Sequence, residues 1–204
     1  MDIASAGTIR FASGDSLNEL NLSTLANVLI TPHELWEPNH ENGGKWISYA
    51  NTGVGGSVPA NSTISPFAPT AFFFEYFTID EPIILNADIH VWADDTAAVY
   101  VNNQLVAQAV EQQDNACAAS APACEPGEGL HADIAQFLKQ GDNILTFKVF
   151  QRGGGPFGLL YEGKVETTNR INPEDPSAVP EPATMGLLGS SLLGLGIWSR
   201  RRKS

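Results

Sequence analysis

The sequence predicts an all-β protein, an antiparallel β-sandwich or jelly roll, followed by a single C-terminal helix of transmembrane type. Two observations lead to the sandwich. Short segments between residues 7 and 165 alternate apolar and polar residues, and this period of two is typical of strands with one buried face. Turn-forming residues, which include 19 Gly and 13 Pro, separate these segments, and almost no long amphipathic helix interrupts them. Antiparallel sandwiches are built from such strands and turns.

The first third of the chain contains fewer regular segments. Residues 7–13 are predicted to form the first strand, and residues 45–49 a later one in which Trp46 is expected to pack on the sandwich core. Residues 16–36 mix helical and strand spacings, so no element is assigned to them. The Gly-, Ser- and Pro-rich residues 51–69 are expected to form a long surface connection.

Strand patterns are strongest from residue 71 onward. Residues 71–79 are apolar on both faces, which predicts a central strand covered on both sides. Residues 83–92 alternate cleanly, and their polar face contains Asn86, Asp88 and His90. The opposite face, which should be buried, consists of Ile83, Leu85, Ala87, Ile89 and Val91.

A hairpin is predicted next. Residues 97–101 and 104–110 should pair through the turn Asn102-Asn103, because Asn tolerates the positive φ that two-residue hairpin turns require. Residues 131–138 are expected to form a short helical turn with Asp133 as its N-cap.

Two more alternating segments, residues 144–150 and 159–165, are predicted to complete the sheets. The chain then changes composition. We therefore expect an exported β-domain over residues 1–166, a polar, Pro-containing linker over residues 167–179, and a separate tail over residues 180–204.

The β-domain resembles galactose-binding-like β-sandwich domains. Those domains commonly carry an Asp-rich turn, a strand ending in Asn-Gly, and a later Gly-x-Asn before another strand. The matching residues here lie in segments 93–106, 133–138 and 141–145, with Asn103 in place of the usual Gly. The resemblance covers about residues 71–166; it implies a fold and does not assign a sugar.

The tail has three parts in a fixed order. The triplet Pro180-Glu181-Pro182 is followed by residues 183–198, which carry no charge. As a helix this run would reach roughly 24 Å, short of a hydrocarbon core of about 30 Å. The final part is basic and should hold its end in the cytoplasm. It consists of Arg200, Arg201, Arg202 and Lys203.

This tail resembles the PEP-CTERM sorting signal of bacterial surface proteins. In that family a membrane-embedded exosortase recognises the Pro-Glu-Pro triplet and cleaves the tail, and members are associated with exopolysaccharide and biofilm material. The resemblance implies that the chain is an exosortase substrate, held in the inner membrane before processing and then found at the cell surface or outside the cell. The alternative is an ordinary C-terminal membrane anchor.

Charge separates the domain from its tail. Residues 1–179 contain 7 Lys or Arg against 22 Asp or Glu, whereas the last 25 residues contain 4 basic residues and one acidic residue. A domain this acidic repels nucleic acid, so no nucleic-acid partner is expected. The acidic balance favours solubility and could attract cations.

The two cysteines, Cys117 and Cys124, are predicted to form a local disulfide. Their spacing is poor for zinc, and no His or further Cys lies close enough to complete a four-ligand site. On the chain-entropy model the bond would stabilise the fold by roughly 2–3 kcal/mol. It implies an oxidising compartment.

The small-residue run Ala4-Ser5-Ala6 has the form of a signal-peptidase site, and we expect the true start to lie further upstream.

Candidate ligand residues are few. Asp94-Asp95 suggests a calcium site, although turn aspartates usually bind their own backbone. Trp92 borders this turn and could stack on a sugar, the alternative being core packing. No other metal or cofactor is expected. His33, His40, His90 and His131 lie in different elements, and the sequence does not show whether they converge.

No nucleophile elbow, zinc-protease helix or phosphate loop occurs in the sequence. We therefore expect a non-enzymatic surface or extracellular-matrix protein whose β-domain binds polysaccharide. Two alternatives stay open, a structural or adhesive module that contacts other proteins and an exported hydrolase with an unrecognised site.

Overall fold

The computed structural model describes residues 6–14, 19–21, 27–61, 64–65, 67–110 and 121–168, with the backbone alone for residues 19–21. The chain separates into the units Met1–Asn169 and Arg170–Ser204, and all described residues belong to the first. The sequence places the end of the β-domain three residues earlier, at residue 166.

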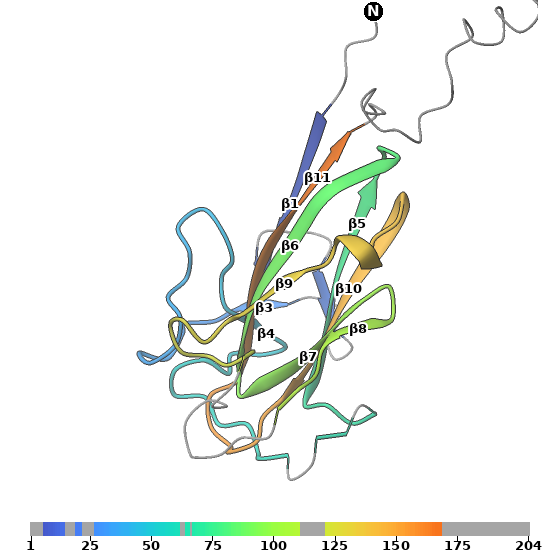
Figure 1. Cartoon of the computed structure of the whole chain (residues 1–204). Helices are drawn as coiled ribbons and strands as arrows, with labels where there is room; N and C mark the ends of the chain where they lie inside the picture. The colour runs from blue at the N-terminus through green and yellow to red at the C-terminus, as the bar shows by residue number, and fades with distance from the viewer. Residues whose placement is uncertain are drawn as a thin grey trace, which may run out of the picture. The chain divides into compact units, whose positions relative to one another are not determined.

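Two antiparallel sheets form the domain (Figure 1). In the first, strand order is β3-β4-β11-β6-β9, and β1 also pairs with β11. Its strands are β1 (Ala6–Ala12), β3 (Val28–Leu29), β4 (Ile47–Ser48), β6 (Ile83–Asp94), β9 (Leu130–Asp133) and β11 (Gly158–Thr168). In the second, the order is β2-β5-β10-β7-β8. Its strands are β2 (Glu19–Asn21), β5 (Ala71–Ile79), β7 (Thr96–Val101), β8 (Gln104–Ala107) and β10 (Gly141–Phe150).

The main core lies between the two sheets. Alternate residues of β6 and β11 meet alternate residues of β5, β7 and β10 in one buried cluster, as expected for strands with one apolar face. Phe147 and Tyr161 stack across it at a ring-centroid distance of 4.4 Å. The Tyr161 hydroxyl donates to the buried carboxylate of Glu75 over 2.9 Å, which gives both polar groups a partner.

A second, smaller cluster lies on the outer face of the six-stranded sheet. Trp92 and Leu160 belong to it, whereas their neighbours Val91 and Leu159 point into the main core. Strand residues alternate between faces, so the cluster covers the opposite side of β6 and β11. Its members are Ile30, Trp36, Trp46, Trp92, Cys124 and Leu160.

The prediction for Trp46 was wrong in its location. Trp46 is fully buried, but in this second cluster, and it is Ile47 that reaches the main core. Trp46 packs on Trp36 at 4.3 Å between ring centroids, and its indole N–H donates to the carbonyl of Glu37 over 2.6 Å. The strand predicted at residues 45–49 is only Ile47–Ser48.

The all-β, antiparallel architecture is confirmed, and the predicted strands from residue 71 onward correspond to β5, β6, β7, β8, β10 and β11. The hairpin turn is also confirmed, since Asn102 and Asn103 have φ values of 50° and 66°. These positive values are those that a two-residue turn requires.

The prediction for residues 131–138 was wrong in its first half. Residues Leu130–Asp133 form strand β9, and only Ala135–Phe137 form a short 3-10 helix, η1. Asp133 nevertheless accepts a hydrogen bond from the Ala135 amide over 2.9 Å, close to its predicted capping role. Strand β9 lengthens the six-stranded sheet beside β6.

Two expectations about buried faces also need correction. Leu85 is 61% exposed, whereas Ile84 packs against the core. The register of β11 against β6 shifts between Glu166 and Thr167, and such a shift changes which side chains face inward.

Strand β5 is flanked by β2 and β10, but the described residues do not cover its outer face completely, because Tyr76 is 43% exposed.

Among the described residues, no helix has the length and apolar character needed to cross a membrane. The predicted helix 183–198, the triplet before it and the basic residues after it all lie outside the described part of the chain.

Candidate functional site

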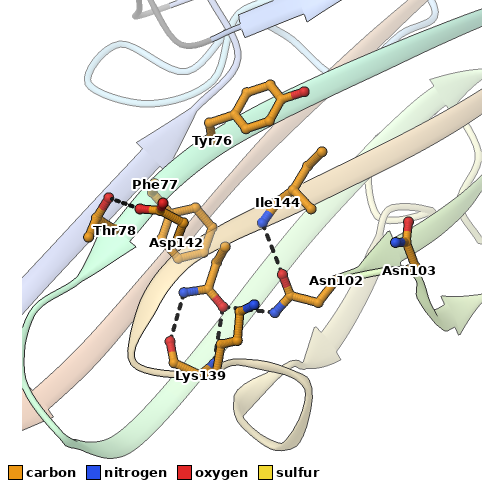
Figure 2. A pocket seen from close by; sticks show the side chains of 9 residues that line it. Tyr76, Phe77, Thr78, Asn102, Asn103, Lys139, Asp142 and Ile144 are labelled. Atoms are coloured by element: carbon orange, nitrogen blue, oxygen red, sulfur yellow. Dashed lines mark hydrogen bonds between the residues drawn. The ribbon is translucent and has the colours of Figure 1, made fainter.

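A cavity of about 660 Å³ lies at one end of the five-stranded sheet (Figure 2). Three parts of the chain meet there: the end of β5, the β7–β8 turn, and the start of β10 with the segment that precedes it. The lining residues are Tyr76, Phe77, Thr78, Asn102, Asn103, Lys139, Asp142, Asn143 and Ile144. We call this cavity the end pocket.

Two asparagines fix one wall of the end pocket. Asn143 is 2% exposed and its carboxamide donates to the carbonyl of Lys139 over 2.8 Å. Asn102 donates to the Asn143 side-chain oxygen over 2.8 Å and accepts from the Ile144 amide over 3.1 Å. These bonds tie the hairpin turn to β10. The Asn and Gly-x-Asn positions that resemble galactose-binding-like domains therefore have a structural role here.

The other wall presents groups that are free to meet a ligand. Tyr76, Asn103, Lys139 and Asp142 are exposed, and Asp142 also accepts from the Thr78 hydroxyl over 2.9 Å. Figure 2 shows this bond on one side of the pocket and the Asn102–Ile144 bond on the other. An aromatic ring, an ammonium, a carboxylate and an amide so placed can recognise a hydroxyl-rich molecule.

A row of aromatic rings leads along β5 to the end pocket. Phe72, Phe74 and Tyr76 alternate with residues that point into the core, so all three lie on the outer face. Neighbouring ring centroids are 6.3 Å and 6.5 Å apart. Tyr76 belongs to both the row and the pocket. We call these three residues, with Tyr100 of β7, the aromatic row.

Lys148 connects the two strands of the aromatic row. Its ammonium lies 4.6 Å from the centroid of the Tyr100 ring and 5.8 Å from that of Phe72. Such cation–π contacts are worth about 0.5–1 kcal/mol at exposed sites. They hold a positive charge over rings on a domain that is otherwise strongly acidic.

The residues that the sequence indicated as ligands are all buried. Trp92 is 7% exposed, Asp94 is 7% exposed and Asp95 is 4% exposed. The indole of Trp92 lies under the backbone of Gly129, as a part of the second cluster. Its packing matches the core alternative, and its role in ligand binding stays a prediction.

Asp94 and Asp95 form a buried carboxyl pair. Burial is the largest cause that raises the pKa of Asp94, to about 9, followed by the neighbouring charge of Asp95 and a hydrogen bond to it. Asp95 accepts hydrogen bonds from the backbone amides of Arg152 and Gly153. Both donors lie in the loop between β10 and β11, more than 50 positions further along the chain, so Asp95 joins the β6–β7 turn to that loop and does not bind the backbone of its own turn. The calcium hypothesis stays a prediction.

Three of the four histidines converge on the outer face of the six-stranded sheet. His90 lies 4.2 Å from His131 and 5.9 Å from Trp92 between ring centroids. His40 contacts the same indole edge-on at 5.3 Å. A cavity of about 480 Å³ beside them is lined partly by His40, His90 and Asp88.

His40 also joins two carboxylates. Its Nδ1 lies 2.9 Å from Glu162 and its Nε2 lies 3.1 Å from Glu37. Burial alone would lower the pKa of His40, but the hydrogen bonds and charges of the two carboxylates outweigh it and raise that pKa. Burial alone would raise the pKa of Glu162, but His40, the Gly44 amide and the charge of His90 lower it.

Several predicted site residues belong to segments that the structure does not describe. Cys117, the sorting triplet and the basic residues 200–203 lie outside the described part of the chain. Cys124 is fully buried in the second cluster, and no described cysteine is free. The Cys117–Cys124 disulfide stays a prediction.

Sequence reasoning missed both the aromatic row and the histidine group. The row had a visible signal, aromatic residues at every second position from Phe72 to Tyr76. The histidine group had a weaker signal in the sequence. His131 reaches the group only because it lies in strand β9, and residues 131–138 were expected to be helical.

Solved structures with similar folds include carbohydrate-binding modules and parts of glycosidases. A family 35 carbohydrate binding module from Clostridium thermocellum is 13% identical, with 77% of this chain and 97% of that chain covered and a TM-score of 0.37. CBM35 from Paenibacillus barcinonensis is 9% identical, with 80% and 99% covered and a TM-score of 0.36. Alpha-L-rhamnosidase from Streptomyces avermitilis, complexed with L-rhamnose, is 20% identical, with 72% of this chain and 14% of that chain covered and a TM-score of 0.44.

The chain spans only a small part of such glycosidases, 9% in the case of Beta-D-Mannosidase from Dictyoglomus thermophilum. At TM-scores below 0.5, these similarities support no statement about ligand or activity. No curated protein matches the chain in sequence.

One family model matches, and it matches the tail. Residues 178–203 fit the model of the PEP-CTERM protein-sorting motif. This range contains the triplet Pro180-Glu181-Pro182, the apolar run and the basic residues that the sequence indicated. The motif indicates a secreted protein that is processed at its C-terminal tail. The chain carries a PEP-CTERM sorting motif that follows an antiparallel β-sandwich in the sequence.

Proposed function

We propose that this chain is an exported, non-enzymatic surface or matrix protein, cleaved at its tail by an exosortase, whose β-domain binds polysaccharide. The observation that carries the first half of the proposal is the sorting motif at residues 178–203. The second half rests on the end pocket and the aromatic row.

The tail suits a transient role in the membrane. Its apolar run is short, and the basic residues behind it keep their end on the cytoplasmic side. The Pro-Glu-Pro triplet comes before the apolar run, on the same side as the β-domain. Cleavage near the triplet would release the domain outward, to the cell surface or the surrounding matrix.

The aromatic row and end pocket form a continuous surface suited to an extended glycan. Aromatic rings pack against the apolar faces of sugar rings, while their polar edges remain available for hydrogen bonds. Spacings of 6.3 Å and 6.5 Å between rings let one chain contact all three side chains of β5. At the end of the row, Lys139, Asp142 and Asn103 offer donors and acceptors to hydroxyl groups.

The charge of the domain restricts the polysaccharide. The β-domain and linker carry 22 acidic and 7 basic residues, so they repel polyanions at long range. We therefore favour a neutral polysaccharide over an acidic one.

Processing is tested in the producing bacterium. Replacement of Pro180 and Pro182 by Ala together should leave the tail attached and the protein in the membrane fraction. The matched control replaces Pro173 and Pro176 of the linker by Ala, which should not alter maturation. Unchanged maturation of the triplet variant would overturn the sortase proposal.

Binding is tested on a glycan array with the full chain in mild detergent. Tyr76→Ala, at the junction of row and pocket, should reduce retention on a neutral glycan by about tenfold, since one aromatic contact is worth roughly 1–1.5 kcal/mol. Phe67→Ala is the control, because Phe67 is 91% exposed outside the row. Absence of glycan binding, or equal loss in both variants, would reject this part and favour a protein-binding adhesive module.

A further inference from the structure

Three neighbouring strands place acidic and imidazole side chains in a grid on the outer face of the six-stranded sheet. In the register of the sheet, His90 of β6 lies opposite His131 of β9 and opposite Glu162 of β11. Two residues earlier on β6, Asp88 lies opposite Asp133 and Lys164. Residues two apart on a strand share a face, so Asp88 and His90 point the same way.

Three of these side chains lie close enough to one another to hold a metal ion. Asp88, His90 and His131 each offer one ligand atom, and the three atoms lie within 4.8 Å of one another. Zinc ligands at about 2.0 Å from the ion are roughly 3.3 Å apart in a tetrahedron. Small rotations of the side chains would close the difference. His131 is exposed, so an ion can reach the group from solvent.

We propose that Asp88, His90 and His131 bind a divalent transition-metal ion of the zinc class. Two imidazoles and one carboxylate are ligands that Zn²⁺ prefers, whereas Ca²⁺ takes oxygen ligands. The site therefore differs in chemistry from the calcium hypothesis at Asp94. Three protein ligands leave at least one coordination position, which water or the facing carboxylate of Asp133 can occupy.

The surroundings of the ring nitrogens favour this assignment. Among the described contacts, no hydrogen bond to another side chain engages His90 or His131, so their nitrogens remain available. Glu162 lies beside His90 and its negative charge suits a cation nearby. Carboxylates behind a ligating imidazole orient the ring and raise its basicity.

One neighbouring side chain, Lys164, should weaken metal binding, so its replacement should have the opposite effect to that of replacing a ligand. The ammonium of Lys164 lies 3.9 Å from Asp88 and 3.1 Å from Glu166. This positive charge competes with a metal for the Asp88 carboxylate. Its removal should tighten metal binding, which a purely structural role of Asp88 would not predict.

The experiment measures Zn²⁺ binding by the full chain, prepared without a histidine tag, freed of metal with chelator and kept in mild detergent. Titration calorimetry and competition with a chromophoric zinc indicator should show one ion per chain. His131→Ala should weaken binding at least about tenfold. His33→Ala, which removes the histidine outside the group, should leave it unchanged. Lys164→Gln should strengthen it.

Asp88→Asn gives a second variant that keeps the volume of the side chain, and circular dichroism checks that each variant is folded. Loss of zinc binding in a folded Asp88→Asn protein supports the site even if His131→Ala does not fold. Absence of zinc uptake at millimolar Zn²⁺, or equal affinity in the Asp88, His131 and His33 variants, would overturn the proposal. The site lies on the sheet opposite the aromatic row, so its failure is independent of the polysaccharide proposal.

Discussion

The two outer faces of this sandwich differ in what covers them. Loops from residues 30–46 and 121–129 close over the outer face of the six-stranded sheet, where Trp36, Trp46 and Trp92 are buried. On the five-stranded sheet the four rings of the aromatic row remain half-buried or, at Tyr76, exposed. Aromatic side chains therefore serve packing on one face, whereas those of the aromatic row on the other face are available for contact.

This difference is the physical reason for assigning ligand contact to the five-stranded sheet. A covered tryptophan has already lost its contact with water in the folded domain. A half-exposed ring still has apolar surface in water, and a partner that covers this surface gains binding free energy. Within the described residues, the covered face keeps the histidine group beside its edge strand β9 accessible.

The largest expected effect compares one aromatic residue from each face. Trp46→Ala should lower the free energy of unfolding by about 3–5 kcal/mol, because it empties the centre of the covered cluster. Phe72→Ala should cost about 1 kcal/mol or less, since it removes only ring and cation contacts at the surface. Denaturant unfolding monitored by fluorescence measures both. Similar costs for the two variants would remove the distinction between the faces.

An intermediate effect is expected at Asn143, which supports the end pocket. Asn143→Ala should cost about 1–3 kcal/mol, because the Lys139 amide and the Asn102 carboxamide then lose a buried partner. The free energy of unfolding measures this. Asp142→Ala, on the exposed wall beside it, is the matched control and should change stability by less than about 0.5 kcal/mol.

The buried Asp94 on the covered face should also make the stability of the protein depend on pH. The folded state keeps the Asp94 proton up to a pKa of about 9, whereas the unfolded chain releases it near 3.8. Between these values the folded state binds more protons, so the free energy of unfolding falls as pH rises. This slope is at most about 1.4 kcal/mol per pH unit.

Asp94→Asn should remove that slope. Unfolding of both proteins at mildly acidic and mildly alkaline pH measures it, and the variant should gain relative to wild type as pH rises. A parallel pH dependence in the two proteins would mean that Asp94 titrates normally and is not held in a dry environment.

The smallest expected effect belongs to the pair His40 and Glu162. The raised pKa of His40 makes its contribution complete below 6.5 and lost as pH rises through the folded value. The lowered pKa of Glu162 makes its contribution present above 4.5 and lost at lower pH. A double-mutant cycle with His40→Gln and Glu162→Gln should give a coupling below about 1 kcal/mol, largest between these limits. A coupling that persists at alkaline pH would contradict an ionic origin.

Patterns over neighbouring residues predicted the strands, the turn and the tail, because neighbouring residues determine these features. The alternation of β6, β10 and β11 and the turn Asn102-Asn103 reflect strand period and φ preference, both of which are properties of neighbouring residues. The tail was recognisable for the same reason, because its triplet, apolar run and basic end are consecutive in the chain.

What depends on pairing between distant strands was not predictable in this way. His90 and His131 are 41 positions apart in the chain and meet only through the register of β6 with β9. The segment 131–138 resembles a capped helical turn, and tertiary pairing with β6 overrides that preference for Leu130–Asp133. Likewise, Trp46 was correctly expected to be buried, but one residue of strand alternation decides which of two clusters it joins.

The most direct test of the central claim is the intact mass of the protein recovered from the producing bacterium. Cleavage by an exosortase predicts a mature chain that ends near the Pro180-Glu181-Pro182 triplet and lacks the apolar run and basic residues. The same measurement on the variant with Pro180→Ala and Pro182→Ala should recover the tail. A mature wild-type chain that still extends to Ser204 would contradict the account.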